Sequence, residues 1–263
     1  MYVTAAAFII TFTVLISASI QDRRSREVSD VHWVIMCATG IAIMLFAAIS
    51  EPSVERIMIC VGSAMMAVNI LHDKERSPFR EILLNAIAML MFFLPAVTAY
   101  GDPFIRDSMV IPISYIIFLA MFFTGAIKGG ADVKCLISLA IAFPMYPMMF
   151  GYPLIDIPGY PITMVMSFPL AVLLHASLFS IFAIVPIIIR NVIRKDTKMP
   201  NMLFGYKMNR YDAENSHVWP MKDHGTERED GERIWVTPKI PFIIPITAAF
   251  IFVALAGNLI FLI

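Results

Sequence analysis

Two apolar runs meet at the stretch Lys128-Gly129-Gly130-Ala131-Asp132-Val133-Lys134, from which the fold class of the chain can be worked out. Residues 111–127 form the run before this stretch, and the next run begins at Cys135. We expect an acid in this position to lie at or just inside a membrane boundary, among glycines that let two backbones approach closely. Ionisable groups are costly in such places, so Asp132 is a candidate functional residue.

The composition of the chain predicts an integral helical membrane protein. Its 263 residues are 59% hydrophobic and 15% charged, and the mean hydropathy is +0.77. A soluble core of this size does not need so much apolar surface. The formal net charge is zero, so no overall field favours binding to nucleic acid. Cys37, Cys60 and Cys135 lie in apolar segments without CxxC spacing, so we expect no metal, cofactor or disulfide framework.

Eight apolar segments are candidates for membrane-spanning helices, since about 20 apolar residues cross a hydrocarbon layer of about 30 Å. Pro144 and Pro147 predict a kink in the sixth segment, and Pro169 and Pro186 predict a bend in the seventh. The expected fold is all-α and polytopic, with about eight transmembrane helices and a small cytoplasmic segment between the last two. The eight segments are residues 2–20, 31–49, 54–71, 82–100, 109–127, 135–150, 162–189 and 240–263.

These segments predict three parts of the chain. Residues 1–190 are expected to form a transmembrane catalytic domain of about seven helices, and residues 240–263 a final transmembrane helix. The extended polar region between them, residues 191–239, is expected to be a cytoplasmic subdomain that either covers the site or recruits a substrate.

The distribution of lysine and arginine predicts an orientation in the membrane. Basic residues gather in the loops after the odd-numbered segments, whereas the alternate loops hold only Arg56, then Arg106, then none. Because basic loops tend to stay in the cytoplasm, both termini are expected outside and the odd-numbered loops inside. The basic residues of those loops are Arg23, Arg24, Arg26, Lys74, Arg76, Arg80, Lys128, Lys134, Arg190, Arg194, Lys195 and Lys198.

This orientation places two acids at the same face of the membrane. Asp22 closes the first segment and Asp132 follows the fifth, so both carboxylates are expected at similar depth on the cytoplasmic side. Two carboxylates that share a site do not both ionise easily, and one of them holds a proton near neutral pH. The ionised partner can take a proton from water while the protonated partner polarises a peptide carbonyl, which is aspartic-type peptide hydrolysis. The pair would titrate jointly.

Other interpretations of the same residues stay open at this point. Asp22 and Asp132 are also compatible with solvated interfacial acids or with anchors of a non-catalytic assembly subunit. A proton-coupled transporter or channel could use them as proton sites, although it would more naturally place its acids near the midplane. Gly129, Gly130 and Ala131 leave room for an extended substrate backbone beside the acid. Lys134 is either a site-shaping or substrate-binding residue, or a lysine that reaches to the membrane surface.

Several strings resemble the archaeal preflagellin and type IV prepilin peptidases, which are membrane aspartic proteases known for a GxGD motif. Asp22 matches the first catalytic aspartate of that family and Asp132 the second, although Ala131 replaces the second motif glycine. The stretch between the two aspartates is longer than in six-span members and leaves room for two further helices. The matching strings are Gln21-Asp22-Arg23-Arg24-Ser25-Arg26-Glu27-Val28, Gly129-Gly130-Ala131-Asp132-Val133-Lys134, Phe204-Gly205-Tyr206-Lys207-Met208 and residues 234–245.

The resemblance implies an aspartic endopeptidase of the cell membrane. Its substrates would be archaellin- or pilin-like precursors that carry a short basic leader ahead of a hydrophobic helix and are cut on the cytoplasmic side. The implied partners are therefore these precursors and membrane lipid, with no nucleic acid and no cofactor. Nothing in the chain resembles the cysteine-rich domain with which bacterial relatives methylate the new terminus, so peptidase activity alone is expected. The sequence does not set an oligomeric state.

Overall fold

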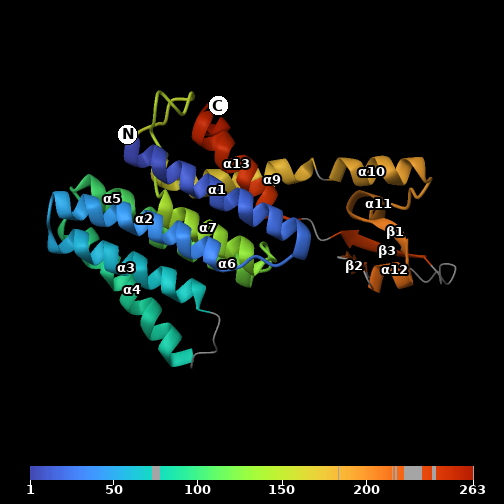
Figure 1. Ribbon diagram of the computed structural model, residues 1–263, viewed down its shortest axis with the longest axis horizontal. Helices are drawn as coiled ribbons and strands as arrows, with labels where there is room; N and C mark the ends of the chain where they lie inside the picture. Colours follow the sequence, from blue (N-terminus) through green and yellow to red (C-terminus); the bar gives the residue numbers. More distant parts are fainter. Residues whose placement is uncertain are drawn as a thin grey trace.

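The N- and C-termini lie on the side of the helical bundle away from a small unit with strands (Figure 1). The computed structural model describes residues 1–72, 78–182, 184–214, 216, 218–221, 233–238 and 241–262. Lys74 and Arg76 of the expected basic loop lie outside these residues.

Six helical stretches in the described residues are long and apolar enough to cross a membrane. Their outward faces carry exposed apolar side chains such as Phe46, Ile49 and Phe123, which are 66%, 75% and 78% exposed. Such surfaces suit contact with lipid rather than water, and the chain is an all-α, multi-pass membrane protein, as expected. The stretches comprise α1 (Tyr2–Ser25), α2 (Val31–Ser50), α3 (Val54–Leu71), α4 (Pro78–Thr98), α5 with α6 (Pro103–Ser108, Val110–Phe123) and α9 with α10 (Phe168–Ile181, Ile184–Ile193).

The other two expected spans are shorter than the sequence suggests. The helices there, α7 (Gly130–Ala142) and α13 (Ile243–Leu255), have 13 residues each, which is roughly 20 Å at 1.5 Å per residue. The expected kink at Pro144 and Pro147 is wrong, because α7 ends at Ala142 before both prolines. A residue that precedes proline is disfavoured in helical conformation, which helps to end the helix there. A count of eight full-length spans therefore stays a prediction.

The seventh segment is also divided. A single turn, α8 (Ile162–Val165), ends before Ser167, and α9 starts afresh with Pro169 in its first turn. Proline is tolerated at this position because the first turn has no partner for its N–H. Pro169 therefore starts a helix rather than bending one. After α13, the chain finishes its described part in a short 3-10 helix, η1 (Leu259–Leu262).

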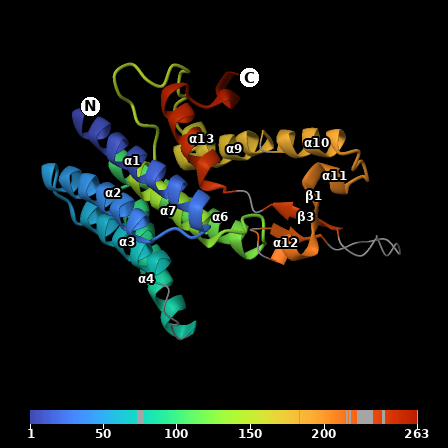
Figure 2. The same ribbon diagram turned by 45° about the vertical axis from the view of Figure 1, so that its right-hand side comes forward.

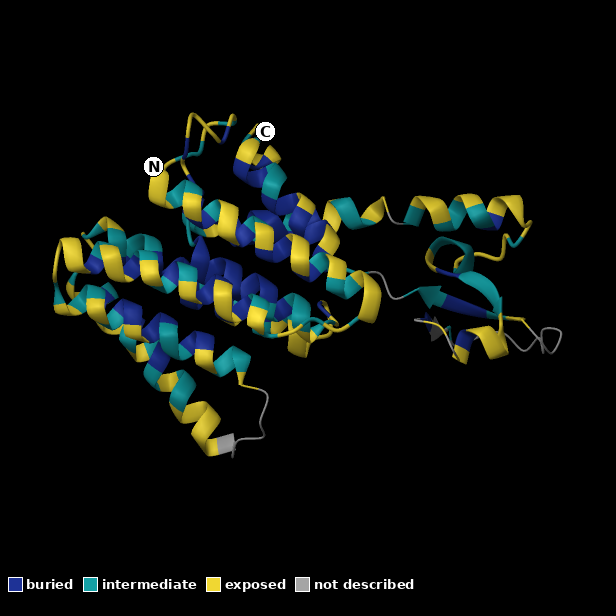
Figure 3. Cartoon of the chain, viewed as in Figure 1, coloured by how far each residue is buried: buried dark blue, intermediate teal, exposed yellow. Residues whose placement is uncertain are grey.

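The short helix α7 is the centre of the bundle. Nine of its residues are buried (Figure 3), and it packs against α2, α3, α6 and α9. Gly40 allows α2 to approach α7 closely, since a Cβ there would overlap the backbone carbonyl of Ile141. Neighbouring helices thus cover a helix too short to span the bilayer alone. They also hold its first turn, which carries Asp132, in a defined place.

The polar region forms a small antiparallel sheet that the all-α expectation did not include. It contains α11 (Asn201–Phe204), β1 (Tyr206–Asn209), α12 (Arg210–Glu214), β2 (Val218–Pro220) and β3 (Arg233–Pro238), with strand order β1-β3-β2. Tyr206 pairs with Val236, and Val218 pairs with Pro238. Aromatic and β-branched residues favour these strands. Figure 2 shows the sheet beyond the end of the bundle, below α10.

One buried amide joins this unit to the membrane helices. The Asn191 Nδ2 on α10 donates to the carbonyl oxygens of Met202 and Gly205 at 2.8 and 2.6 Å. The Arg190 guanidinium lies over the Tyr206 ring, 4.0 Å from its centre. Gly205 has no room for a side chain, because a Cβ there would overlap the Val236 carbonyl oxygen. The Phe204–Met208 string therefore has a structural explanation in this close approach.

Candidate functional site

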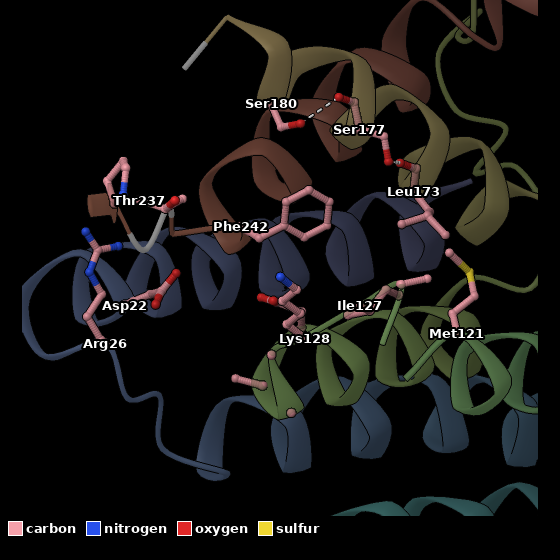
Figure 4. A pocket seen from close by; sticks show the side chains of 16 residues that line it. Asp22, Arg26, Met121, Ile127, Lys128, Leu173, Ser177, Ser180, Thr237 and Phe242 are labelled. Carbon is pink, nitrogen blue, oxygen red and sulfur yellow. Dashed lines mark hydrogen bonds between the residues drawn. The ribbon is translucent and has the colours of Figure 1, made fainter. Parts of the chain in front are cut away.

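A cavity of about 750 Å³ lies at the end of the bundle nearest the sheet (Figure 4). The end of α1, the first turn of α7, one face of α9 and the chain before α13 form its walls. Both aspartates singled out from the sequence line this cavity, although they are far apart along the chain. The lining residues are Asp22, Arg26, Met121, residues 126–132, Leu173, Ser177, Ser180, Thr237, Pro238 and Phe242.

Two helix ends position the acids. Asp22 is in the last turn of α1, and its carbonyl oxygen accepts from the backbone N–H of Arg26, where the chain turns in left-handed conformation (φ 60°). Asp132 is in the first turn of α7, directly after the glycines. Both acids thus come from helix ends that border the same cavity. The sequence predicted that both acids lie at the same membrane face but did not establish that they share a cavity.

Gly129 makes room for the carboxyl group of Asp132. It precedes α7 in extended conformation (φ −88°, ψ 121°), which any residue can adopt. A Cβ at this position would nevertheless fall on Oδ2 of Asp132. Gly130 has open space where its Cβ would be, and with Ala131 it also lines the cavity. The three small residues thus form an open wall beside Asp132.

Positive groups accompany the two acids. Arg26 lies beside Asp22 in the cavity wall (Figure 4), and Lys128 lies on the opposite wall. Within the part of the chain that the structure describes, Nε and Nη1 of Arg26 are buried without an acceptor. The backbone N–H of Ile243, the first residue of α13, faces the Asp22 carboxylate. Helix N-termini carry partial positive charge, so the start of α13 adds to the positive surroundings of Asp22.

Lys134 lies outside the cavity lining. Its Nζ donates to both carboxylate oxygens of Asp30, each at 2.9 Å, and the two side chains are 15% and 32% exposed. This contact joins α7 to the loop between α1 and α2. The sequence left two interpretations of Lys134 open. Its ion pair with Asp30, close to the site, favours a site-shaping role over a side chain that reaches to the membrane surface.

Sequence reasoning did not single out several lining residues. Ser177 and Ser180 on α9 face the cavity, with their hydroxyls donating to the carbonyls of Leu173 and Ser177 at 2.9 and 2.7 Å. Two serines three residues apart in an apolar helix were the available signal. Thr237 and Phe242 come from residues 234–245, which were noted only as a family-like string. That string leads from β3 past the cavity into α13.

Metal-binding groups do not gather in this site. Among the described residues, no three His, Cys, Asp or Glu side chains are grouped so that they could hold a metal ion. The chemistry that the lining can supply comes from two carboxyls, a guanidinium, an ammonium group, hydroxyls and backbone N–H groups.

The fold and the cavity define a multi-pass helical membrane protein with two acids at one end of its bundle. Comparison with known proteins indicates which class of membrane protein the chain resembles. The chain is 26% identical to a preflagellin peptidase of Methanococcus maripaludis over 264 residues, which cover 93% of this chain and 92% of that protein. It is 27% identical to the preflagellin peptidase of Methanocaldococcus jannaschii over 270 residues, covering 95% and 94%.

No family model matches the chain. The two similarities nevertheless run over almost the full length of each protein. The resemblance to the archaeal preflagellin peptidases that was expected from the sequence is confirmed.

Proposed function

We propose that this protein is a membrane-embedded aspartic endopeptidase that removes the short leader of preflagellin- or prepilin-like precursors at the cytoplasmic face. The observation that carries the proposal is that Asp22 and Asp132, from α1 and α7, line one cavity. The two relatives that match nearly the full length of the chain are named preflagellin peptidases, which supports the same activity here.

The reaction needs one ionised and one protonated carboxyl. The ionised group takes a proton from a water molecule held between the two, and the oxygen of that water attacks the scissile carbonyl carbon. The protonated group donates to the carbonyl oxygen as it gains negative charge. When the C–N bond breaks, a proton returns from the pair to the leaving amine. Two groups that interact titrate as a pair, so neither acid is assigned a fixed role.

The cavity suits an extended peptide that emerges from the membrane. Its walls are apolar at Met121, Leu173 and Phe242, and polar at Arg26 and Thr237. In the proposed orientation, the hydrophobic helix of the precursor lies toward the apolar walls and its leader toward the sheet. The small residues Gly129 and Gly130 leave space for a backbone beside Asp132. The 191–239 region would then supply one wall of the site through Thr237 and Pro238.

Purified protein in liposomes tests the proposal directly. It should cut a synthetic precursor with a basic leader and a hydrophobic helix, and a gel shift and mass spectrometry would locate the cut. In water labelled with oxygen-18, one labelled oxygen should enter the new carboxyl terminus of the leader. A proton-coupled transporter would leave the precursor intact and give pH-dependent flux in the same liposomes. That result would refute the peptidase.

A further inference from the structure

The loop between α1 and α2 makes an ion pair with the central helix α7. Asp30 is the residue before α2, where an aspartate ordinarily accepts a hydrogen bond from the first turn of the helix. Its side chain makes no such cap bond here. Both carboxylate oxygens instead accept from Lys134 Nζ on α7, at 2.9 Å each. The Ser29 hydroxyl, one residue earlier, accepts from the first backbone N–H of α2, that of Val31, at 3.4 Å. The Asp30 carboxylate therefore joins two elements instead of capping the helix.

On the other side, the same loop is tied to α1. The backbone N–H of Ser29 donates to Oε1 of Gln21 at 3.2 Å, and the Ser25 hydroxyl donates to the Glu27 carbonyl at 2.8 Å. His32 Nδ1 donates to the Ser29 carbonyl at 2.9 Å. The other ring nitrogen of His32 then accepts from the Ser17 hydroxyl at 3.0 Å. The loop is therefore built as a rigid link.

These contacts form a short chain of bonds between the two acids. Gln21 is the neighbour of Asp22, and it binds Ser29. Ser29 is the neighbour of Asp30, which binds Lys134, two residues beyond Asp132. Both α1 and α7 pack against α2, and this loop connects the end of α1 to the start of α2. The ion pair between Lys134 and Asp30 is the strongest of these contacts, because both of its partners are charged and both carboxylate oxygens accept.

From this arrangement we propose that Lys134 is a positioning residue, and that its ion pair with Asp30 sets the separation of the Asp22 and Asp132 carboxyls. The inference rests on the proposed function, which requires the two groups to share one water molecule. Catalytic groups have to be held within about 0.5 Å of the productive geometry. A misplacement of about 1 Å costs up to about 100-fold in rate.

Single and paired substitutions test the ion pair. Lys134→Met and Asp30→Asn should each lower kcat by about 10- to 100-fold with little change in KM, because the substrate-binding walls remain. Their combination should cost no more than either change alone, since both remove one contact. The exchanged pair, Asp30→Lys with Lys134→Asp, should recover most of the lost kcat. The Asp30 variant alters only a loop side chain and keeps the test valid if Lys134→Met folds poorly.

Asp102→Asn is the matched control, because it breaks a comparable ion pair far from the cavity. Asp102 binds Arg56 through two bonds of 2.7 and 3.0 Å at the opposite end of the bundle. This control should leave kcat unchanged although it removes a similar contact. An equal fall in kcat for the control would show that the loss reflects general stability, and the proposal would be wrong.

A distance measurement separates this proposal from the peptidase activity itself. Spin labels at Arg24→Cys and Gly130→Cys report the spacing of the two helix ends, and the native cysteines are buried. Lys134→Met should shift or broaden the distance distribution, and the exchanged pair should restore it. An unchanged distribution, or a loss of kcat that the exchange does not recover, would overturn the positioning role. Failure of the peptidase assay itself would leave this distance test intact.

Discussion

Replacing Gly129 by alanine should damage the proposed reaction while sparing the fold. The backbone at Gly129 is extended (φ −88°, ψ 121°), so alanine fits its conformation without strain. The new Cβ would, however, occupy the place of Oδ2 of Asp132. That atom is the end of a side chain that can rotate, so the carboxyl moves and the helix stays. The cost therefore falls on the geometry of the site.

The size of the effect follows from how far the carboxyl has to move. Relieving the overlap requires a shift on the order of 1 Å, and a misplacement of that size costs up to about 100-fold in rate. We expect kcat for leader removal by Gly129→Ala to fall by about 10- to 100-fold. Thermal unfolding in detergent and the yield of inserted protein should match the unsubstituted chain.

Gly130→Ala provides the matched comparison for this experiment. Its Cβ would meet open space, and alanine favours the first turn of α7 that begins there. This variant should be at least as stable as the unsubstituted protein. It leaves the Asp132 carboxyl in place, so its fall in kcat should be much smaller than that of Gly129→Ala. Equal rates for the two variants, measured by gel shift on one precursor, would refute the view that Gly129 makes room for Asp132.

Three further outcomes follow from the structure. Gly40→Ala should lower the free energy of unfolding by about 1–3 kcal/mol, because its Cβ overlaps the backbone carbonyl of Ile141. Gly101→Ala is the control and should leave the free energy of unfolding unchanged, because its Cβ would meet open space. Denaturation of both variants in detergent measures the difference. The cleavage rate should fall at both low and high pH, since the carboxyl pair has to keep a single proton; a rate that rises steadily across the range would contradict this. The hydrogen bonds from Arg56 hold the pKa of Asp102 below its ordinary value. This pair therefore stabilises the fold at pH values above the unfolded-state pKa, and the stabilisation is lost as the pH falls through the lowered pKa. The melting temperature of Asp102→Asn should therefore change less in acid than that of the parent.

The apolar runs predicted most of the membrane architecture because each long helix is read from consecutive residues. Composition and hydropathy were enough to locate the helices from α1 to α6, and the outward apolar faces agree with the expected lipid contact. Periodicity did not reveal that α7 is short and central. Its apolar residues face other helices rather than lipid, and both environments select the same side chains.

The candidate site was only partly predictable for a similar reason. Asp22 and Asp132 stood out because acids are rare at the ends of apolar runs, and the resemblance added weight to both. The contact between Lys134 and Asp30 joins residues that are distant along the chain, and a single sequence carries no signal for such a pair. The sheet of the polar region was missed because its strands are short and its charged residues favoured a solvated segment.

Substituting each of the two acids singly tests the central claim most directly. Asp22→Asn and Asp132→Asn keep the size of each side chain, so each variant should fold and insert as the parent does. Each should lose leader removal in liposomes, because amides cannot exchange a proton with the bound water. Cleavage at the parent rate by either variant would contradict the paired-carboxyl mechanism and the role given to that residue.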